Sequence, residues 1–367
     1  NSISDKALRY DLTVPLSRYV QQNLNEITLP FKRFQTQLVW RADRPQKGRY
    51  REFLQCDVDI IGEKNFLNEV ECIKVYDYVF ENLGLPKLVL RINNREILEG
   101  ISKIMKINSL SEISSTLDKS DKIGIDGVLD ELVKKGIDNE SIDKLIFFLN
   151  IDGSNENKID IVRKEFNNEN ISSNSIDLIE KIINTCDQFK LNNIEIEFDL
   201  SLARGLGYYT GTILEVSSPQ NFNIGSVGGG GRYDDLVQKN NPKLSGFGIS
   251  FGFDRIFLIL EALNLFPNLL DSSKSFLFLN FGTDKILNFI DSVNKLRKDD
   301  IVCEIYPDDV KIKKQLDYAN KKGIDFVVII GDDELKKDIF KVKDMSKGEE
   351  STYTEIDSLA QKIKDIS

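Results

Sequence analysis

The sequence contains no histidine in its 367 residues. This absence excludes Ser-His-Asp and Cys-His nucleophile systems, zinc sites with histidine ligands, and proton shuttles that use an imidazole. Any acid–base chemistry must therefore come from carboxylates, tyrosine, lysine, cysteine or the substrate itself.

Cysteine is also scarce, and long apolar runs are missing. The four cysteines (Cys56, Cys72, Cys186 and Cys303) include no CxxC pair, so the sequence predicts neither a zinc site nor a disulfide framework. Such usage is typical of a reducing, cytoplasmic compartment. No apolar run approaches the roughly 20 residues of a membrane span, and no signal-peptide pattern begins the chain. We expect a cytoplasmic protein with no membrane partner and no metal held by its own side chains.

The charge balance is acidic, with 49 Lys and Arg against 59 Asp and Glu, a net charge of −10. This argues against a non-specific nucleic-acid binder, although it leaves room for a local basic site. Hydrophobic residues make up 41% of the chain and charged residues 29%, as in globular proteins that bury a core. The length suggests two or three domains.

Residues 1–98 are rich in arginine and aromatic side chains. Two strand-like runs, 34–40 and 53–61, flank the turn-prone stretch 44–48, and together they predict a long hairpin. Residues 68–83 follow with apolar positions at helical spacing.

Residues 99–190 contain few aromatic residues and predict a helical insertion. Residues 125–132 and 142–149 have the pattern of short amphipathic helices. The polar stretch 152–158 is expected to be a loop.

Residues 191–268 return to strands, beginning with 194–200, and are rich in glycine. The final segment, 272–367, alternates short apolar runs with helical patterns, which predicts a small α/β domain with βαβ units. Its expected strands are residues 276–280, 301–305 and 326–330.

A cluster of basic residues lies in the predicted hairpin. Residues 32–52 carry seven Lys or Arg against two acidic residues. Arginine offers a planar, permanently charged fork that matches phosphate oxygens. We therefore favour a polyphosphate or nucleotide site over a solvated, salt-bridged hairpin. The basic members are Lys32, Arg33, Arg41, Arg44, Lys47, Arg49 and Arg51.

Three glycine-rich segments have two interpretations each. Arg204–Gly211 is either a small pocket that binds an anion beside two tyrosines or a glycine-rich turn. Gly228–Gly231 allows close backbone approach to a ligand, or forms a flexible loop. Gly252–Arg255 either points Arg255 at a phosphate or pairs it with Asp254 at the start of a helix.

Polar residues alternate along the second strand of the hairpin. Gln55, Asp57 and Asp59 share one face because side chains alternate with a two-residue period. That face is either exposed to solvent or forms a polar pocket for an amine-bearing substrate. Asp11 and Thr13 add a carboxylate and a hydroxyl upstream.

Four of these segments together resemble the histidyl-tRNA synthetases, which are class II aminoacyl-tRNA synthetases. Residues 41–53 resemble the motif 2 hairpin, and residues 246–255 resemble motif 3. Residues 202–211 resemble the peptide found only in histidine-specific members, and residues 228–234 its companion glycine segment. The Asp11-Leu12-Thr13 form is similar to the eukaryotic-like branch.

The resemblance implies an α+β class II catalytic domain, an antiparallel sheet flanked by helices. The implied domains are a catalytic first part (1–98), a helical insertion (99–190), a catalytic second part (191–268) and a small α/β anticodon-binding domain (272–367). It implies a histidine–tRNA ligase that forms histidyl-adenylate from histidine and ATP and passes histidine to tRNA(His). A homodimer is implied, and Mg²⁺ would be held mainly by the ATP phosphates.

The family's ATP contacts carry over by position. Arg41 would bind the α-phosphate, while Arg49 and Arg255 would hold the outer phosphates. Gly229 and Gly230 would lie along the adenosine. Fixed guanidinium groups suit this reaction because negative charge builds at the α-phosphate.

The histidine contacts carry over in the same way. Arg204 and Arg41 are the expected catalytic residues, and both would also touch histidine. The α-amino end of the substrate would be held by Asp11, Thr13 and Gln55. The imidazole end would be held by Asp59, Tyr208 and Tyr209, since a carboxylate that faces a ring N–H selects a substrate with that donor.

One departure and two alternatives accompany the resemblance. The family's motif 1, part of the dimer interface, is expected before residue 1. The alternatives are a synthetase-like regulatory subunit of ATP phosphoribosyltransferase and a non-catalytic tRNA-sensing module. Either of these proteins should have lost catalytic arginines. This chain keeps all four that the resemblance assigns to the reaction: Arg41, Arg49, Arg204 and Arg255.

The C-terminal segment is not basic overall, with 17 Lys and Arg against 20 Asp and Glu in residues 271–367. A lysine cluster in it is either a tRNA-facing surface or an ordinary solvated helix face. Its members are Lys311, Lys313, Lys314, Lys321 and Lys322.

Overall fold

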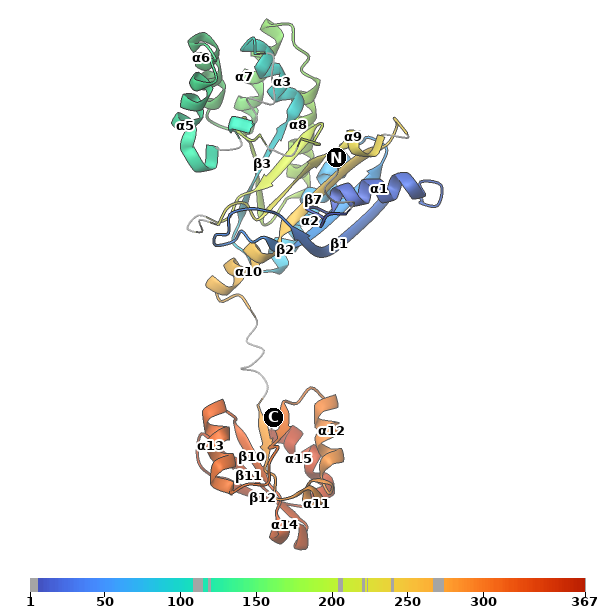
Figure 1. Ribbon diagram of the computed structural model, residues 1–367, viewed down its shortest axis with the longest axis vertical. Coiled ribbons are helices and arrows are strands. Elements are labelled where there is room, and N and C mark those ends of the chain that lie inside the picture. The colour runs from blue at the N-terminus through green and yellow to red at the C-terminus, as the bar shows by residue number, and fades with distance from the viewer. Residues whose placement is uncertain are drawn as a thin grey trace. The chain divides into compact units, whose positions relative to one another are not determined.

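The computed structural model describes residues 6–107, 115–117, 120–203, 207–219, 222, 224–238, 241–266 and 274–366. The chain divides into two compact units, Asn1–Phe266 and Pro267–Ser367 (Figure 1). Each unit has its own sheet and its own hydrophobic core.

The first unit is built on a sheet that has seven strands in the described residues. The strand order is β1-β2-β7-β6-β5-β3-β4, and all neighbours are antiparallel except β3 and β4. This confirms the expected antiparallel sheet. The strands are β1 (Phe31–Trp40), β2 (Glu52–Gly62), β3 (Leu88–Asn94), β4 (Ile194–Phe198), β5 (Thr212–Val216), β6 (Gly228–Arg232) and β7 (Ser245–Gly252).

The predicted hairpin is present as β1 and β2, paired from Phe31↔Ile61 to Trp40↔Glu52. The sequence placed its strands within three residues of the observed bounds. The turn-prone stretch 44–48 lies in the connection between them. Because β2 also pairs with β7, the hairpin's second strand lies inside the sheet rather than at its edge.

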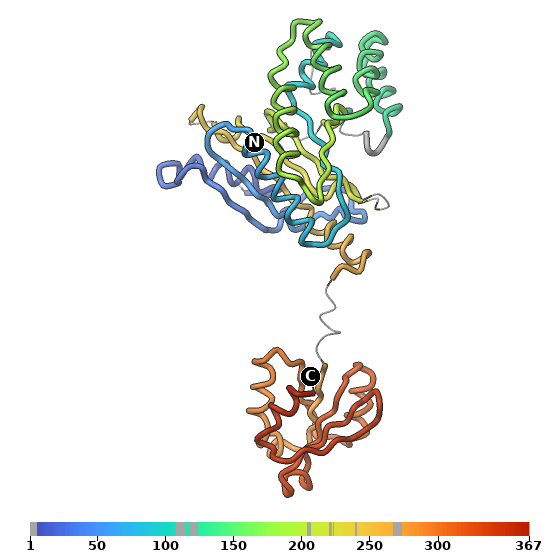
Figure 2. The backbone as a smooth tube through the Cα atoms, turned by 180° about the vertical axis from the view of Figure 1, so that it is seen from behind, coloured from blue at the N-terminus to red at the C-terminus, as the bar shows by residue number. Residues whose placement is uncertain are grey.

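The helices of the first unit fall into two groups. Those near the sheet are α1 (Thr13–Asn23), α2 (Leu67–Asn82), α9 (Asp234–Val237) and α10 (Phe253–Ala262). Those of the predicted helical region are α3 (Arg95–Ile104), α5 (Ser120–Lys134), α6 (Asn139–Leu149), α7 (Asn155–Asn168) and α8 (Asn174–Phe189). Helices α3, α5, α6 and α7 gather at one end of the unit, as the views from both sides show (Figures 1 and 2), whereas α8 packs against α2 and β3.

The predicted loop at 152–158 is wrong in its second half, because α7 begins at Asn155. The Ser154 side chain accepts the backbone N–H of Asn157 at 3.2 Å and caps the helix. Serine and asparagine favour both loops and helix starts, so polar composition alone could not separate the two.

The main core lies between the sheet and helices α2 and α8, and continues into the helical region. Tyr76, Phe80 and Phe251 form an aromatic cluster in it, with ring centroids 4.8 to 5.7 Å apart. On β2, Val58 and Ile60 face this core. Since side chains alternate along a strand, the residues between them face the opposite side of the sheet.

The second unit is a mixed sheet in the order β12-β11-β10-β8-β9. β9, β8 and β10 run parallel, as βαβ units require, which confirms the three predicted strands. The antiparallel β11 and β12 were not predicted. The strands are β8 (Phe276–Phe278), β9 (Cys303–Ile305), β10 (Phe326–Ile329), β11 (Ile339–Asp344) and β12 (Glu350–Thr354).

Helices flank this second sheet. They are α11 (Thr283–Ile286), α12 (Ile290–Lys298), α13 (Ile312–Lys322), α14 (Asp332–Lys336), the 3₁₀ helix η2 (Ile356–Ser358) and α15 (Leu359–Ile366). Four of the five clustered lysines lie on α13, and Lys311 immediately precedes it.

The glycine run is a buried strand, so the flexible-loop interpretation is wrong. β6 lies between β5 and β7, and its glycines allow the neighbouring strands to approach closely. A Cβ at Gly230 would lie 2.2 Å from the Gly248 carbonyl oxygen and 2.8 Å from the Ile249 Cα.

We predict that Gly230→Ala destabilises the first unit by roughly 1–3 kcal/mol or more, because backbone atoms cannot move aside as a side chain can. Gly207→Ala is the matched control, since a Cβ there meets nothing within 4 Å. Thermal and urea unfolding would compare the two variants. Equal stabilities would contradict the close packing of β6.

Candidate active site

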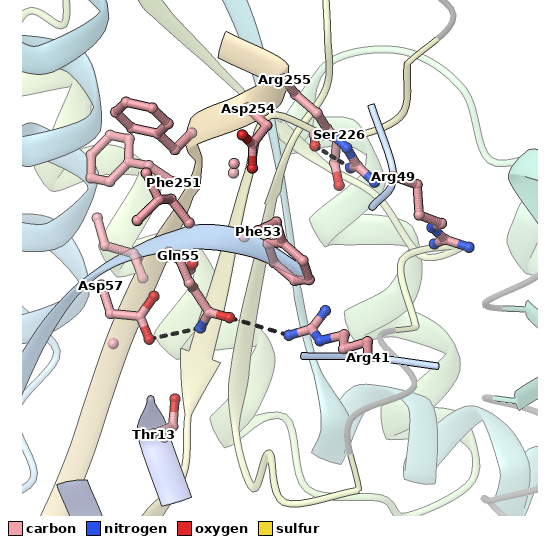
Figure 3. A pocket seen from close by; sticks show the side chains of 18 of the residues that line it. Thr13, Arg41, Arg49, Phe53, Gln55, Asp57, Ser226, Phe251, Asp254 and Arg255 are labelled. Atoms are coloured by element: carbon pink, nitrogen blue, oxygen red, sulfur yellow. Dashed lines mark hydrogen bonds between the residues drawn. The ribbon is translucent and has the colours of Figure 1, made fainter. Parts of the chain in front are cut away.

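A pocket opens on the face of the first sheet opposite the main core. Its walls come from the β1–β2 hairpin, β6, β7, the segment after residue 206 and the start of α10 (Figure 3). Nine residues predicted from the sequence line it: Thr13, Arg41, Arg49, Gln55, Asp59, Tyr208, Tyr209, Gly229 and Arg255.

Three predicted residues do not line the described pocket. Asp11 is buried beside it, accepts the Val14 N–H at 3.2 Å and interacts with Tyr208. Gly230 lies within β6, where it pairs with Ile249 of β7. Arg204 falls outside the described residues.

Several lining residues were not predicted. Asp43, Tyr50 and Phe53 belong to the hairpin that carries the motif 2 resemblance, so that segment was the signal available for them. Tyr233 and Ser250 lie in the segments 228–234 and 246–255, which also carry the family resemblance, but their place in the pocket depends on how β6 and β7 pair with β2.

The guanidinium groups are held by oxygen acceptors. Arg41 donates from Nε to the Tyr10 carbonyl at 3.0 Å and from Nη2 to Gln55 Oε1 at 3.3 Å, and it lies 5.1 Å from the Phe53 ring centroid. Arg255 donates to the carbonyls of Gly48 and Ser226 at 2.7 and 2.5 Å. Carbonyl acceptors orient a guanidinium without neutralising its charge.

Some basic residues of the hairpin line the pocket, as a phosphate site requires, and others are exposed or paired with acidic side chains. Arg41 and Arg49 line the pocket, although Arg49 Nε also lies 3.7 Å from the Asp43 carboxylate. Lys32 instead forms an exposed ion pair with Glu71 at 2.6 Å. Arg44 is exposed and does not line the pocket.

The polar face of β2, formed by Gln55, Asp57 and Asp59, is buried. These side chains are 7%, 2% and 2% exposed, and all three line the pocket. The solvent-face interpretation is therefore wrong, and the strand presents a polar wall to a ligand.

Of the three side chains, Asp59 has both a hydrogen-bond donor and an ion-pair partner. Tyr233 donates its hydroxyl to Oδ1 at 2.7 Å, and Arg33 Nη2 lies 3.0 Å from Oδ2. A Cβ at Gly248 would fall 2.1 Å from Oδ1, so only glycine leaves room for the carboxylate. Burial raises the pKa of Asp59, while Arg33 and Tyr233 oppose that rise.

Asp57 accepts a hydrogen bond from Gln55 Nε2 at 2.9 Å. Burial, together with the like charge of Asp59, raises the pKa of Asp57 to about 7. Its carboxyl group is thus poised between its charged and neutral forms near neutral pH.

The two ends of the pocket differ chemically. The polar face of β2 and the two tyrosines form one end of the pocket. Arg41, Arg49 and Arg255 lie toward the hairpin connection and α10, together with the carboxyl groups of Asp43 and Asp254. This arrangement suits a substrate with hydrogen-bond donors at one end and a polyanion at the other.

The comparisons with known proteins show the family to which the chain belongs. The family model described as "Histidyl-tRNA synthetase" matches residues 4–256. The chain belongs to the histidyl-tRNA synthetase family. A second model, "Anticodon binding domain", matches residues 280–366.

Individual relatives support the assignment. The "Histidine--tRNA ligase" of Christiangramia forsetii is 45% identical over 96% of this chain and 77% of its own length. That of Azobacteroides pseudotrichonymphae is 49% identical over 94% of this chain and 75% of its own length. The crystal structure of histidyl-tRNA synthetase from Nostoc sp. PCC 7120 is 30% identical, with a TM-score of 0.77 over 98% of this chain and 84% of that one.

These findings confirm the family, the class II synthetase fold and the enzyme class predicted from the sequence. A "regulatory subunit/histidyl-tRNA synthetase" from Bacillus halodurans, 19% identical with a TM-score of 0.67, shares the fold alone. In the described part of the chain, no helix has the length and apolarity needed to cross a bilayer.

We predict that Asp57→Asn is more stable than wild type, and that its advantage in the free energy of unfolding of the first unit grows as the pH rises from about 4 to about 8. Between the unfolded pKa near 3.8 and the folded pKa of about 7, the folded protein binds more protons, so wild-type stability falls with pH. Asparagine lacks this charge, and the difference should reach the order of 1–4 kcal/mol above pH 7.

Unfolding midpoints measured at several pH values would check this prediction. The comparison must be made within one pH series because burial raises the pKa of the neighbouring Asp59 as well. A stability difference that does not change with pH would show that Asp57 titrates normally.

Proposed function

We propose that this chain activates histidine with ATP, releasing pyrophosphate, and transfers histidine from the adenylate to tRNA(His). The observation that carries the proposal is a single pocket in which the buried polar face of β2 meets Arg41, Arg49 and Arg255. The family membership of the chain supports the same reaction.

The histidine end of the pocket would be formed by the polar face of β2 and the two tyrosines. Asp59 would accept an imidazole N–H beside Tyr208 and Tyr209, since Arg33 and Tyr233 already fix the carboxylate in place. Asp11, Thr13 and Gln55 would surround the α-amino group. A buried acceptor that loses its donor costs free energy, so this wall would discriminate against side chains without a ring N–H.

The phosphate end would be formed by arginines. The histidine carboxylate oxygen attacks the α-phosphorus of ATP, and the bond from that phosphorus to the pyrophosphate oxygen breaks. We assign Arg41 to the α-phosphate and Arg49 and Arg255 to the outer phosphates. Arg204 would stabilise the charge that develops at the α-phosphate.

The nucleoside would lie along β6, beside Gly229 and Gly230. Among the described residues, no group of three or more Asp, Glu or Cys side chains could hold a metal ion. We therefore propose that Mg²⁺ is carried by the ATP phosphates, as is usual for this ion. The substrate phosphates would take part in proton transfer, because the chain contains no imidazole.

We propose that the chain works as a cytoplasmic homodimer, and that its domains divide at the residue ranges predicted from the sequence. The anticodon arm of tRNA would meet the exposed lysines of α13. A regulatory subunit or a tRNA-sensing module would not require this set of pocket arginines, so the enzyme is the better supported function.

We predict that the wild-type chain catalyses histidine-dependent ATP–pyrophosphate exchange and that Arg41→Ala lowers kcat/KM by about 10²- to 10³-fold, because a fixed charge at the reacting phosphate is lost. Arg44→Ala is the matched control, since Arg44 lies in the same hairpin but outside the pocket lining. It should retain wild-type exchange.

An absence of histidine-dependent exchange in the folded wild-type protein would overturn the enzyme proposal. An Arg41→Ala variant as active as Arg44→Ala would overturn only the role given to Arg41.

We predict that the double variant Lys313→Glu, Lys314→Glu raises KM for tRNA about tenfold or more in aminoacylation, because phosphate contacts become repulsive. ATP–pyrophosphate exchange, which needs no tRNA, should be unchanged. Lys362→Glu on α15 is the control for added negative charge on the same unit. Equal KM values for the double variant and the control would place the tRNA contact elsewhere.

A further inference from the structure

The Gln55 side chain bridges two residues of the pocket. Its Nε2 donates to Asp57 Oδ2 at 2.9 Å, and its Oε1 accepts from Arg41 Nη2 at 3.3 Å. Figure 3 shows the chain of Asp57, Gln55 and Arg41 across the pocket wall. The amide therefore has one end committed to a carboxylate and the other to a guanidinium.

The two ends of a glutamine amide have nearly the same shape but opposite chemistry, so neighbours decide which end faces which way. A carboxyl group keeps an acceptor oxygen in both its charged and its neutral form, whereas a guanidinium only donates. Asp57 and Arg41 thus favour the same orientation, with the NH₂ group toward Asp57 and the oxygen toward Arg41 and the pocket.

Asp57 is well placed to hold this orientation. It lies two residues from Gln55 on the same face of β2, and only 2% of it is exposed. Its own position is set by the pairing of β2 with β7, where it lies opposite Ser250. Water therefore competes little for the Gln55 NH₂ group.

We propose that Asp57 is a positioning residue for the α-amino group of histidine: it turns the Gln55 amide so that the oxygen, and not the NH₂ group, faces the substrate. An ammonium group only donates hydrogen bonds, so a reversed amide would place donor against donor. This inference rests on the proposed function. It adds a role for Asp57, which acts through Gln55 and does not itself contact the substrate.

The test separates an effect through the α-amino group from a general loss of structure. Calorimetry would measure binding of histidine and of 3-(imidazol-4-yl)propanoate, which keeps the ring and carboxylate but lacks the amino group. The variants are Asp57→Leu, which removes the acceptor at similar volume, and Asp57→Asn, which keeps an acceptor oxygen. Asp57→Ala serves if the leucine variant does not fold.

For Asp57→Leu or Asp57→Ala we expect histidine affinity to fall roughly tenfold, a typical consequence of a misplaced buried hydrogen bond. Affinity for the propanoate should stay within about twofold of wild type, because the group that Gln55 serves is absent. Asp57→Asn should recover most of the histidine affinity. In a Gln55→Leu background, the Asp57 substitutions should cause no further loss of histidine binding.

A parallel loss for histidine and the propanoate would overturn the inference, because Asp57 would then act on the ring or on the fold. Unchanged histidine affinity in Asp57→Leu or Asp57→Ala would overturn it as well. If wild type binds histidine but shows no histidine-dependent exchange, the proposed reaction fails while the role of Asp57 is still decided by the binding data. If wild type binds no histidine, both fail.

Discussion

The site depends on the cost of burying carboxylates. Asp57 and Asp59 lie on one face of an interior strand, almost out of contact with solvent. An unpaired buried charge is strongly unfavourable, so each must find partners or take up a proton. Asp59 has Arg33, Tyr233 and the space left by Gly248. Asp57 accepts hydrogen bonds from the Gln55 amide and the Ser250 side chain, and burial still raises its pKa to about 7. The two carboxyl groups are thus held by different sets of neighbours.

The sheet brings these groups together from distant parts of the chain. β2 lies between β1 and β7, so the hairpin arginines and the start of α10 meet above the same strand, although Gln55 and Arg255 are far apart in sequence. One face of β2 packs on the main core, which fixes the strand. The other face can then hold polar groups in a preorganised arrangement, and preorganised dipoles and charges act strongly in a site shielded from water.

Much of this arrangement was predictable from the sequence, for identifiable reasons. The alternation of residues 53–61 predicted β2 and grouped Gln55, Asp57 and Asp59 on one face, but alternation cannot tell which face is buried. The partners of Asp59 were not predicted, because Arg33 depends on the β1–β2 register and Tyr233 on the path after β6. Ser154 was assigned to a loop because a helix cap and a loop use the same residues. Arg204 was predicted from family resemblance and lies outside the described residues.

The central claim is that the buried polar face of β2 recognises the hydrogen-bond donors of the substrate. Its most direct test compares histidine with 2-thienylalanine, which has a similar ring size but no ring N–H, in ATP–pyrophosphate exchange. The account predicts that kcat/KM for the thienyl analogue is lower by about 10³-fold or more, as in sites that leave a buried acceptor without its donor. Activation of both amino acids within about tenfold of each other would contradict it.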